Sequence, residues 1–407
     1  MYTKEDKKYI TAAVIAVVIT VFIIIFSEQA FNAALEGLKV WWEVVFPSLL
    51  PFFIIAEILM GLGVVHFMGA LLEPLMRPIF RVPGVGAFAM AMGLASGYPI
   101  GAKITGNLRR KKLCTRTEAE RLISFTNTAD PLFMIGAVAV GMFHRADLGI
   151  IMAGAHYISS LLVGFTLRFY KRKESRTEVK INNKQNRKTN IFKRAVNELI
   201  EARKKDGRTT GELLGDAIKE SINTLLLVGG FIILFSVITK MFIATGLITA
   251  IGRILMILLE PMGMTKTMVL PLISGFFEIS NGTNLASQAQ APLLHQIIIA
   301  NAIIAWSGMS VHAQVATMIN GTDIKLKPYI FARILQSILA GLITIFLFKP
   351  YMENIQSAFL PFIEGFSIQH GFIWILLIFI GIMALCLSLS MMIYFFQRFK
   401  IIFFHHK

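Results

Sequence analysis

Long apolar stretches separated by short basic loops make up most of the chain, and polar residues interrupt two of them. The first interruption, SGYPIGAK at 96–103, lies inside the apolar segment 84–108. The second, SGFFEISNG at 274–282, lies inside the segment 269–288. Proline removes a backbone donor and glycine permits unusual backbone angles. Freed backbone groups at bilayer depth need protein or a water-filled cavity around them, so we expect a broken or re-entrant helix at each place.

The two interruptions belong to an internal repeat. The string LLEP occurs at 71–74 and again at 258–261, each time at a similar distance before an interrupted segment. Interrupted hydrophobic segments at corresponding positions of two halves indicate the binding site of a transporter. The pattern therefore predicts two related halves with a site between them.

Composition and charge agree with a membrane protein. Of the 407 residues 55% are hydrophobic, and the mean hydropathy is +0.66. The net charge of +16 is concentrated in loops, which favours cytoplasmic loops over a nucleic-acid surface. Placing the basic loops inside predicts an all-α polytopic protein of about eight full spans. The first interrupted segment then enters from the cytoplasm and the second from the opposite side, so the repeats are inverted.

One long hydrophilic stretch, 171–215, separates the halves and carries many basic residues. We interpret it as a solvated cytoplasmic linker. The alternative for 190–204 is a basic amphipathic helix that lies on the anionic leaflet.

Polar groups inside the apolar segments are the candidate site, because ionisable and strongly polar residues at bilayer depth are costly. The candidate substrate-binding residues are Ser96, Gly97, Tyr98, Lys103, Asn127, Asp130, Glu278, Ser280, Asn281, Asn301, Ser310 and His312, with Asn284 and Gln314 beside them. The alternative is that such groups only bond one another and hold helices together. Lys103 has the further alternative of reaching back to the cytoplasm, and His312 that of a core histidine.

Half-helix ends suggest what the site binds. Backbone amides at half-helix N-termini would hold an anion, and unwound carbonyls would hold a cation. Glu278 and Asp130 fit an anionic substrate poorly. They could carry coupling protons, or they could be paired structurally.

No catalytic motif accompanies these residues. The chain has no HExxH, no GxSxG and no Cys/His metal cluster, and its two cysteines, Cys114 and Cys386, are far apart. We therefore expect no enzyme, no cofactor, no metal site and no disulfide. No ATP-binding motif is present, so direct use of ATP would need a partner.

Several strings resemble a known family. They are WWEVVFPSLLPFF at 41–53, LEPLMRP at 72–78, RVPGVG at 81–86, ASGYP at 95–99 and SFTN at 124–127. They are similar to sporulation integral membrane proteins whose halves carry the gate, or nucleoside recognition, domain, which concentrative nucleoside transporters share. The apolar and basic segments divide the chain into an N-terminal transmembrane helix at 1–40, two halves at 41–170 and 216–349, the linker at 171–215, and a C-terminal transmembrane helix with a basic tail at 350–407. The resemblance implies that the two halves are gate-type repeats.

The resemblance also implies a function. It suggests a multi-pass protein of the cell membrane or outer forespore membrane that passes dipicolinic acid from mother cell towards forespore, for spore cortex formation. The partners expected are this small molecule, the lipid bilayer, a coupling ion and a second copy of the chain, with no nucleic acid. Two alternatives stay open: a nucleoside-type permease, and a membrane scaffold for spore envelope assembly.

Overall fold

The computed structural model describes residues 3–174, 177 and 191–358, and every regular element in these ranges is a helix. The expected all-α architecture is therefore confirmed for this part of the chain. The expected C-terminal span at 371–396 and the basic tail lie outside the described residues, as does most of the linker before residue 191.

The first half consists of a long bent helix, a surface helix, a helical hairpin and a broken helix. Its elements are α1 (Lys4–Ile25), α2 (Ser27–Val40), the π-helix η1 (Trp41–Val45), α3 (Phe46–Gly61), α4 (Val64–Leu75), the π-helix η2 (Met76–Phe80), α5 (Gly86–Ser96), α6 (Ile100–Arg110), α7 (Arg116–Thr126), the π-helix η3 (Phe133–Met142) and α8 (Leu148–Leu167). Thr115 and Glu118 form a capping box at the start of α7, which satisfies the first free amides of that helix.

The second half repeats this order after one linker helix. Its elements are α9 (Ile191–Asp206) in the linker, then α10 (Thr210–Ala244), α11 (Leu247–Leu259), the 3-10 turns η5 (Glu260–Met262) and η6 (Lys266–Met268), α12 (Val269–Phe277), α13 (Ile279–Gln288), α14 (Leu293–Trp306), α15 (Gly308–Met318) and α16 (Leu326–Ala358). A second capping box, Thr209 with Glu212, starts α10.

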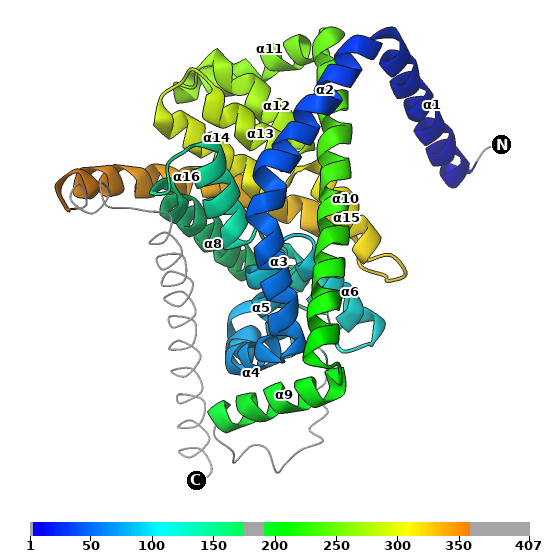
Figure 1. Ribbon diagram of the computed structural model, residues 1–407, viewed down its shortest axis with the longest axis vertical. Helices are drawn as coiled ribbons and strands as arrows, with labels where there is room; N and C mark the ends of the chain where they lie inside the picture. The colour runs from blue at the N-terminus through cyan, green and yellow to red at the C-terminus, as the bar shows by residue number, and fades with distance from the viewer. Residues whose placement is uncertain (1–2, 175–176, 178–190, 359–407) are drawn as a thin grey trace.

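The two halves correspond element by element. Gly63, at φ 83°, starts α4, and Gly246, at φ 72°, starts α11; both are left-handed positions that glycine adopts without strain. A hairpin follows in each half, α5–α6 and then α12–α13, and after it a broken helix, α7–η3 and then α14–α15. Helices α4 and α11 lie at opposite ends of the molecule, as inverted repeats require (Figure 1).

Glycine allows each hairpin to pack closely. A Cβ on Gly93 of α5 would lie 1.7 Å from the Thr126 carbonyl oxygen, and one on Gly101 of α6 would lie 2.3 Å from the same atom. In the second hairpin, a Cβ on Gly282 would lie 2.2 Å from the Gly275 Cα. The first hairpin thus touches the backbone of α7, and the two arms of the second hairpin touch each other. The expected interruption of both apolar segments is confirmed, and each segment forms a helical hairpin.

The long helices α2 and α10 run side by side along the molecule (Figure 1). The Trp41 indole at the end of α2 donates to the Leu225 carbonyl over 2.9 Å. The same indole lies 2.7 Å from where a Cβ on Gly229 would be. This contact joins the two halves through a buried aromatic ring.

By length and composition, four described helices could cross a membrane, or six if each of two bent pairs counts as one span. The expected number was about eight, including the span at 371–396. The difference arises because the breaks divide the chain into shorter pieces: η3, for example, has 10 residues.

Part of the linker is a docked helix, which corrects the interpretation of the whole stretch as solvated chain. Helix α9 packs against α4, and its residues Ile191 and Ala195 are buried. Arg194 forms an ion pair with Glu73 and also donates to the Ala70 carbonyl. The helix of the alternative interpretation is therefore present, with Ile191 and Ala195 buried, while its position on the anionic leaflet stays a prediction.

Candidate functional site

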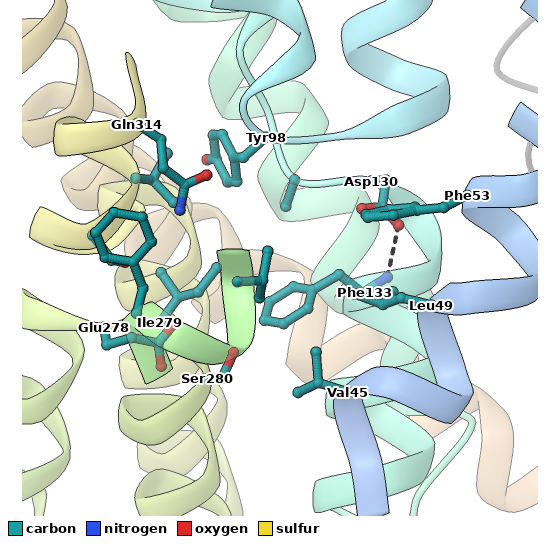
Figure 2. Close-up of a pocket in the computed structure, with 15 residues that line it drawn as sticks. Val45, Leu49, Phe53, Tyr98, Asp130, Phe133, Glu278, Ile279, Ser280 and Gln314 are labelled. Carbon is teal, nitrogen blue, oxygen red and sulfur yellow. Dashed lines mark hydrogen bonds between the residues drawn. The ribbon is translucent and has the colours of Figure 1, made fainter. Parts of the chain in front are cut away.

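A cavity lies where the two hairpin tips meet the two helix breaks (Figure 2). The cavity volume, measured as the space that the centres of water molecules can occupy, is about 50 Å³. One water needs about 10–15 Å³ by this measure, so the cavity has room for a few waters. It is lined by Val45, Leu49, Phe53, Tyr98, Ala129, Asp130, Phe133, Val228, Phe231, Glu278, Ile279, Ser280, Ser310, Val311 and Gln314.

Both hairpin tips reach this cavity. Tyr98 comes from the turn between α5 and α6, and its hydroxyl donates to the Ile304 carbonyl on α14 over 3.1 Å. Glu278 joins α12 to α13, and Ser280 lies in the first turn of α13; both lie opposite Tyr98 in Figure 2. The first tip thus bonds to the second half, and α13 of the second hairpin packs against η3 of the first half, so both halves build the cavity.

Two buried carboxyl groups on the cavity wall cap helices. Asp130 accepts hydrogen bonds from the amides of Leu132 (2.9 Å) and Phe133 (2.8 Å), at the start of η3. Glu278 accepts from the Asn281 amide at 2.8 Å, at the start of α13. Carboxylates at such positions satisfy free amides and offset the positive end of the helix dipole. These two half-helix N-termini are therefore already bonded to carboxyl groups of the protein.

The break between α14 and α15 is different. Ser310 lines the cavity and is 1% exposed, and its buried hydroxyl has no hydrogen-bond partner in the described part of the chain. Gln314, one turn further along α15, lines the same wall. Helix α15 begins at a left-handed Ser307 that gives no side-chain cap. An unpaired buried hydroxyl is costly, so this wall offers unused bonding capacity to a ligand.

Other candidate residues hold the structure around the cavity. Asn127 donates to the Tyr329 hydroxyl over 2.9 Å and accepts from the Ala102 amide over 3.3 Å. Gly97, at φ 69°, packs against Asp130: a Cβ there would lie 2.4 Å from its carboxyl oxygen. These contacts fasten the first hairpin to the first helix break.

Three candidates of the second half also bond within the protein. Asn281 donates to the Ser236 hydroxyl over 2.8 Å, and Asn301 donates to the Thr344 hydroxyl over 2.6 Å. The Nδ1 atom of His312 lies 2.7 Å from the Gly308 carbonyl, and its ring lies between those of Trp306 and Tyr329. None of the three lines the cavity, although the His312 Nε2 atom has no partner among the described residues.

Two candidates lie to one side of the cavity, in spaces that α10 also lines. Ser96 lines a narrow space next to it, and Lys103 lies in a wider space beyond, where its amine is 3.5 Å from Glu220. The structure therefore brings Tyr98, Asp130, Glu278, Ser280 and Ser310 together, with Gln314, and places the other candidates around them.

The sequence interpretation missed Arg333. This side chain of α16 is fully buried. It donates to the carbonyls of Ser124 and Asn127, the latter over 3.1 Å, and lies 3.4 Å from the Tyr98 hydroxyl. An arginine inside the apolar span 328–348 carries the same signal of costly charge at depth that selected Glu278 and Asp130.

His156 and Tyr157 of α8 were missed too. His156 accepts from the Ala129 amide over 3.1 Å, and the Tyr157 hydroxyl donates to the Ala129 carbonyl over 3.2 Å. The signal here is weak, because single polar residues commonly hold membrane helices together. Only the structure shows that both serve the same residue in the first helix break.

Comparison with known proteins bears on this architecture. Residues 42–165, which contain the first hairpin and the first helix break, match the Gate family described as nucleoside recognition. The sporulation integral membrane protein YlbJ of Bacillus subtilis is 48% identical over 332 residues, which cover 82% of this chain and 81% of that protein. The chain belongs to the YlbJ family of sporulation integral membrane proteins.

A solved structure is similar as well. The chain resembles a CNTnw variant in an outward-facing state, with 13% identity, a TM-score of 0.41, and coverage of 85% of this chain and 88% of that one. A likeness of this degree says nothing about substrate. As a YlbJ family member, the chain is an integral multi-pass membrane protein. The name of the relative refers to sporulation and to the membrane and names no reaction.

Proposed function

We propose that this YlbJ family member is a sporulation-specific transporter of a small organic anion, with dipicolinic acid as the candidate substrate. It would move the anion from the mother cell towards the forespore and so serve spore cortex formation. The observation that carries the proposal is the cavity at the meeting point of two hairpin tips and two helix breaks. Interrupted helices that line a cavity between inverted repeats are the usual construction of a transporter site.

The lining suits a flat aromatic acid. Four aromatic side chains, Phe53, Tyr98, Phe133 and Phe231, give faces against which a planar ring can pack. Ser280, Ser310 and Gln314 give polar groups for carboxylate oxygens. The present volume admits a few waters only, so a substrate of this size requires the cavity walls to separate during transport.

Asp130 and Glu278 would supply the coupling. A doubly charged acid beside two carboxylates at bilayer depth is strongly disfavoured. Protons taken up by the two carboxyl groups, or a cation held between them, would offset that charge. We therefore propose that a coupling ion accompanies the anion.

One observation favours a second candidate, a nucleoside-type permease. The fifteen residues that line the cavity include two carboxyls but neither lysine nor arginine. Such a lining suits a neutral substrate with hydroxyl and amine donors as well as it suits a protonated acid.

Flux into proteoliposomes tests both candidates. Purified protein would be assayed with labelled dipicolinate and, separately, with labelled nucleosides, with and without a proton or sodium gradient. We expect dipicolinate uptake that a gradient accelerates and that Glu278→Gln abolishes. The matched control is Glu260→Gln, the same change on the exposed turn after α11. Nucleoside uptake without dipicolinate uptake would favour the permease, and no uptake of either by folded protein would contradict transport.

A further inference from the structure

Three spaces follow one another from the central cavity towards the cytoplasmic side. The central cavity shares Phe53 and Tyr98 with a narrow space that is also lined by Ser96, Ser221 and Thr224. We call this narrow space the neck. The neck in turn shares Glu57 with a wider space, the vestibule. Because consecutive spaces have wall residues in common, they form one line between α3, α10 and the first hairpin.

The vestibule is wide and charged. It holds about 400 Å³ for the centres of water molecules and contains the cations Lys103, Arg208 and Lys219. Glu57, Asp216 and Glu220 lie among them. These basic residues adjoin the linker and the basic loop after α6, which are the cytoplasmic parts by the distribution of lysine and arginine. The vestibule thus opens at the end of the molecule where an anion from the cytoplasm would arrive.

The neck is narrow and polar. It holds about 10 Å³ by the same measure, which is at the limit for one water. Ser221 of α10 is 1% exposed, and its hydroxyl has no hydrogen-bond partner in the part of the chain that the structure describes. Ser96 and Thr224 add two more hydroxyls. An unpaired buried hydroxyl would be destabilising in a packed apolar contact between helices, whereas in a hydrated path water would be its hydrogen-bond partner.

We propose that the substrate path of this protein to the cytoplasm runs from the vestibule at Lys103 through the hydroxyl-lined neck beneath Tyr98 into the central cavity, and that the Lys103–Glu220 ion pair closes its mouth. The proposal rests on the proposed transport function and adds the route and the docking cation. Its ligand is a small carboxylate, because a carboxylate can replace Glu220 as the partner of Lys103.

The ion pair is suited to opening. The Lys103 amine lies 3.5 Å from the Glu220 carboxylate, and both side chains are about half exposed, at 46% and 52%. Exposed pairs of this kind are weak. An incoming carboxylate therefore competes for Lys103 without a large barrier. Phe53 and Tyr98, shared by the neck and the cavity, form the tighter closure behind it.

Cysteine labelling tests the path directly. Cys114 is buried, and burial raises the pKa of its thiol to about 12, so it stays protonated and unreactive near neutral pH. With Cys386→Ala, the protein then has no readily reactive cysteine of its own. Ser96→Cys and Ser221→Cys place thiols on opposite walls of the neck. A membrane-impermeant thiol reagent would be added to the cytoplasmic side of inside-out vesicles.

We expect both neck thiols to react at least about tenfold faster than Leu227→Cys, because only a hydrated thiol ionises. Leu227 is the matched control: it lies on the same helix, α10, and is 48% exposed on its outer surface. Dipicolinate at saturating concentration should slow labelling of both neck thiols. Neck thiols as slow as the control, or faster reaction from the opposite side, would overturn the path.

Replacing the ion pair tests the closure. Glu220→Gln should speed labelling of the Ser221→Cys thiol by up to about fivefold, the effect of removing a weak exposed pair. Lys103→Gln should do the same and also raise the KM for dipicolinate without lowering the maximal rate. No change in labelling with either variant would contradict the closure. If the neck thiols are labelled but the protein transports neither dipicolinate nor nucleosides, the path would be upheld and the proposed function refuted.

Discussion

The two broken helices of this protein differ in how the polar groups at the break are hydrogen-bonded to the surrounding protein. At the first break, residues 127–130, the polar groups have partners within the protein. Arg333 donates to the Asn127 carbonyl, His156 accepts from the Ala129 amide, and Asp130 caps η3. Thr128 donates to the Gly93 carbonyl over 3.2 Å. This break is held by side chains from two other helices, α16 and α8, and by a backbone carbonyl of α5.

The second break, at Ser307, is held more loosely. The Ser307 hydroxyl lies 3.4 Å from the Tyr329 hydroxyl, at the long end for a hydrogen bond. Two buried polar atoms nearby, Ser310 Oγ and His312 Nε2, have no partner among the described residues. His156 Nδ1 and Arg333 Nε, on the helices that support the first break, also have no partner among the described residues, but the polar groups of residues 127–130 themselves are bonded. The inverted repeats thus share a backbone plan, while the residues of the two breaks are bonded unequally. The first break acts as scaffold, and the second keeps bonding capacity for a ligand.

Among the variants, replacement of Arg333 should lower the stability of the protein most, because its side chain supports the first helix break. In Arg333→Met the carbonyls of Ser124 and Asn127 lose their donor, at a cost of about 4 kcal/mol in the free energy of unfolding if each contributes about 2 kcal/mol. The measurement is thermal unfolding in detergent. Arg253→Met, on the exposed face of α11, is the matched control and should unfold like the wild type. Equal melting temperatures for both variants would show that the first break needs no such support.

Filling the contact between the first hairpin and the first break should cost somewhat less. In Gly93→Ala the new methyl group would lie 1.7 Å from the Thr126 carbonyl oxygen, so backbone must move, at about 3 kcal/mol. The control is Gly230→Ala on α10, where nothing lies within 4 Å of the new methyl group. This control should gain a few tenths to about 1 kcal/mol in the free energy of unfolding, because alanine has a higher helix propensity than glycine. A Gly93→Ala protein as stable as this control would contradict the close packing.

Much of this arrangement follows from the sequence. Glycine and proline inside apolar segments 84–108 and 269–288 predict the two hairpins, and the repeated LLEP string predicts their relation. Tyr98, Asp130, Glu278, Ser280 and Ser310 were expected to share a site, and the structure places them around one cavity. Local rules suffice here, because a break in a membrane helix has few permitted surroundings.

The rest depends on contacts between distant parts of the chain. Asn127 and Asn301 look alike in sequence, and only packing shows that their partners are Tyr329 and Thr344. The docking of α9 on α4 required knowledge of which apolar faces meet. Arg333 lies in the apolar span 328–348, which no glycine or proline break marks as a site, and the partners of its charge come from distant parts of the chain.

Loss of the Ser310 hydroxyl should affect transport and spare stability. The hydroxyl has no partner in the described structure, so Ser310→Ala should leave the free energy of unfolding unchanged or raise it by up to about 1 kcal/mol. If the hydroxyl bonds the substrate carboxylate, the apparent affinity for dipicolinate falls about tenfold. Flux against substrate concentration measures this. Ser287→Ala, on α13 outside the cavity, should leave the affinity unchanged and lower stability by up to about 1 kcal/mol, because its hydroxyl donates to the Asn284 carbonyl. A loss of stability in Ser310→Ala larger than this would refute the open second break.

The smallest effect is expected at Asn301, which lies in the second half but away from the cavity. Its side chain donates to Thr344 over 2.6 Å, between α14 and α16. Asn301→Leu removes this bond and leaves an apolar contact of similar size, so stability should fall by about 1 kcal/mol. The KM for dipicolinate should be unchanged, because no ligand contact is lost. A raised KM with an unaltered melting temperature would instead make Asn301 part of the binding site, and the bonding capacity of the second half would then extend beyond the break.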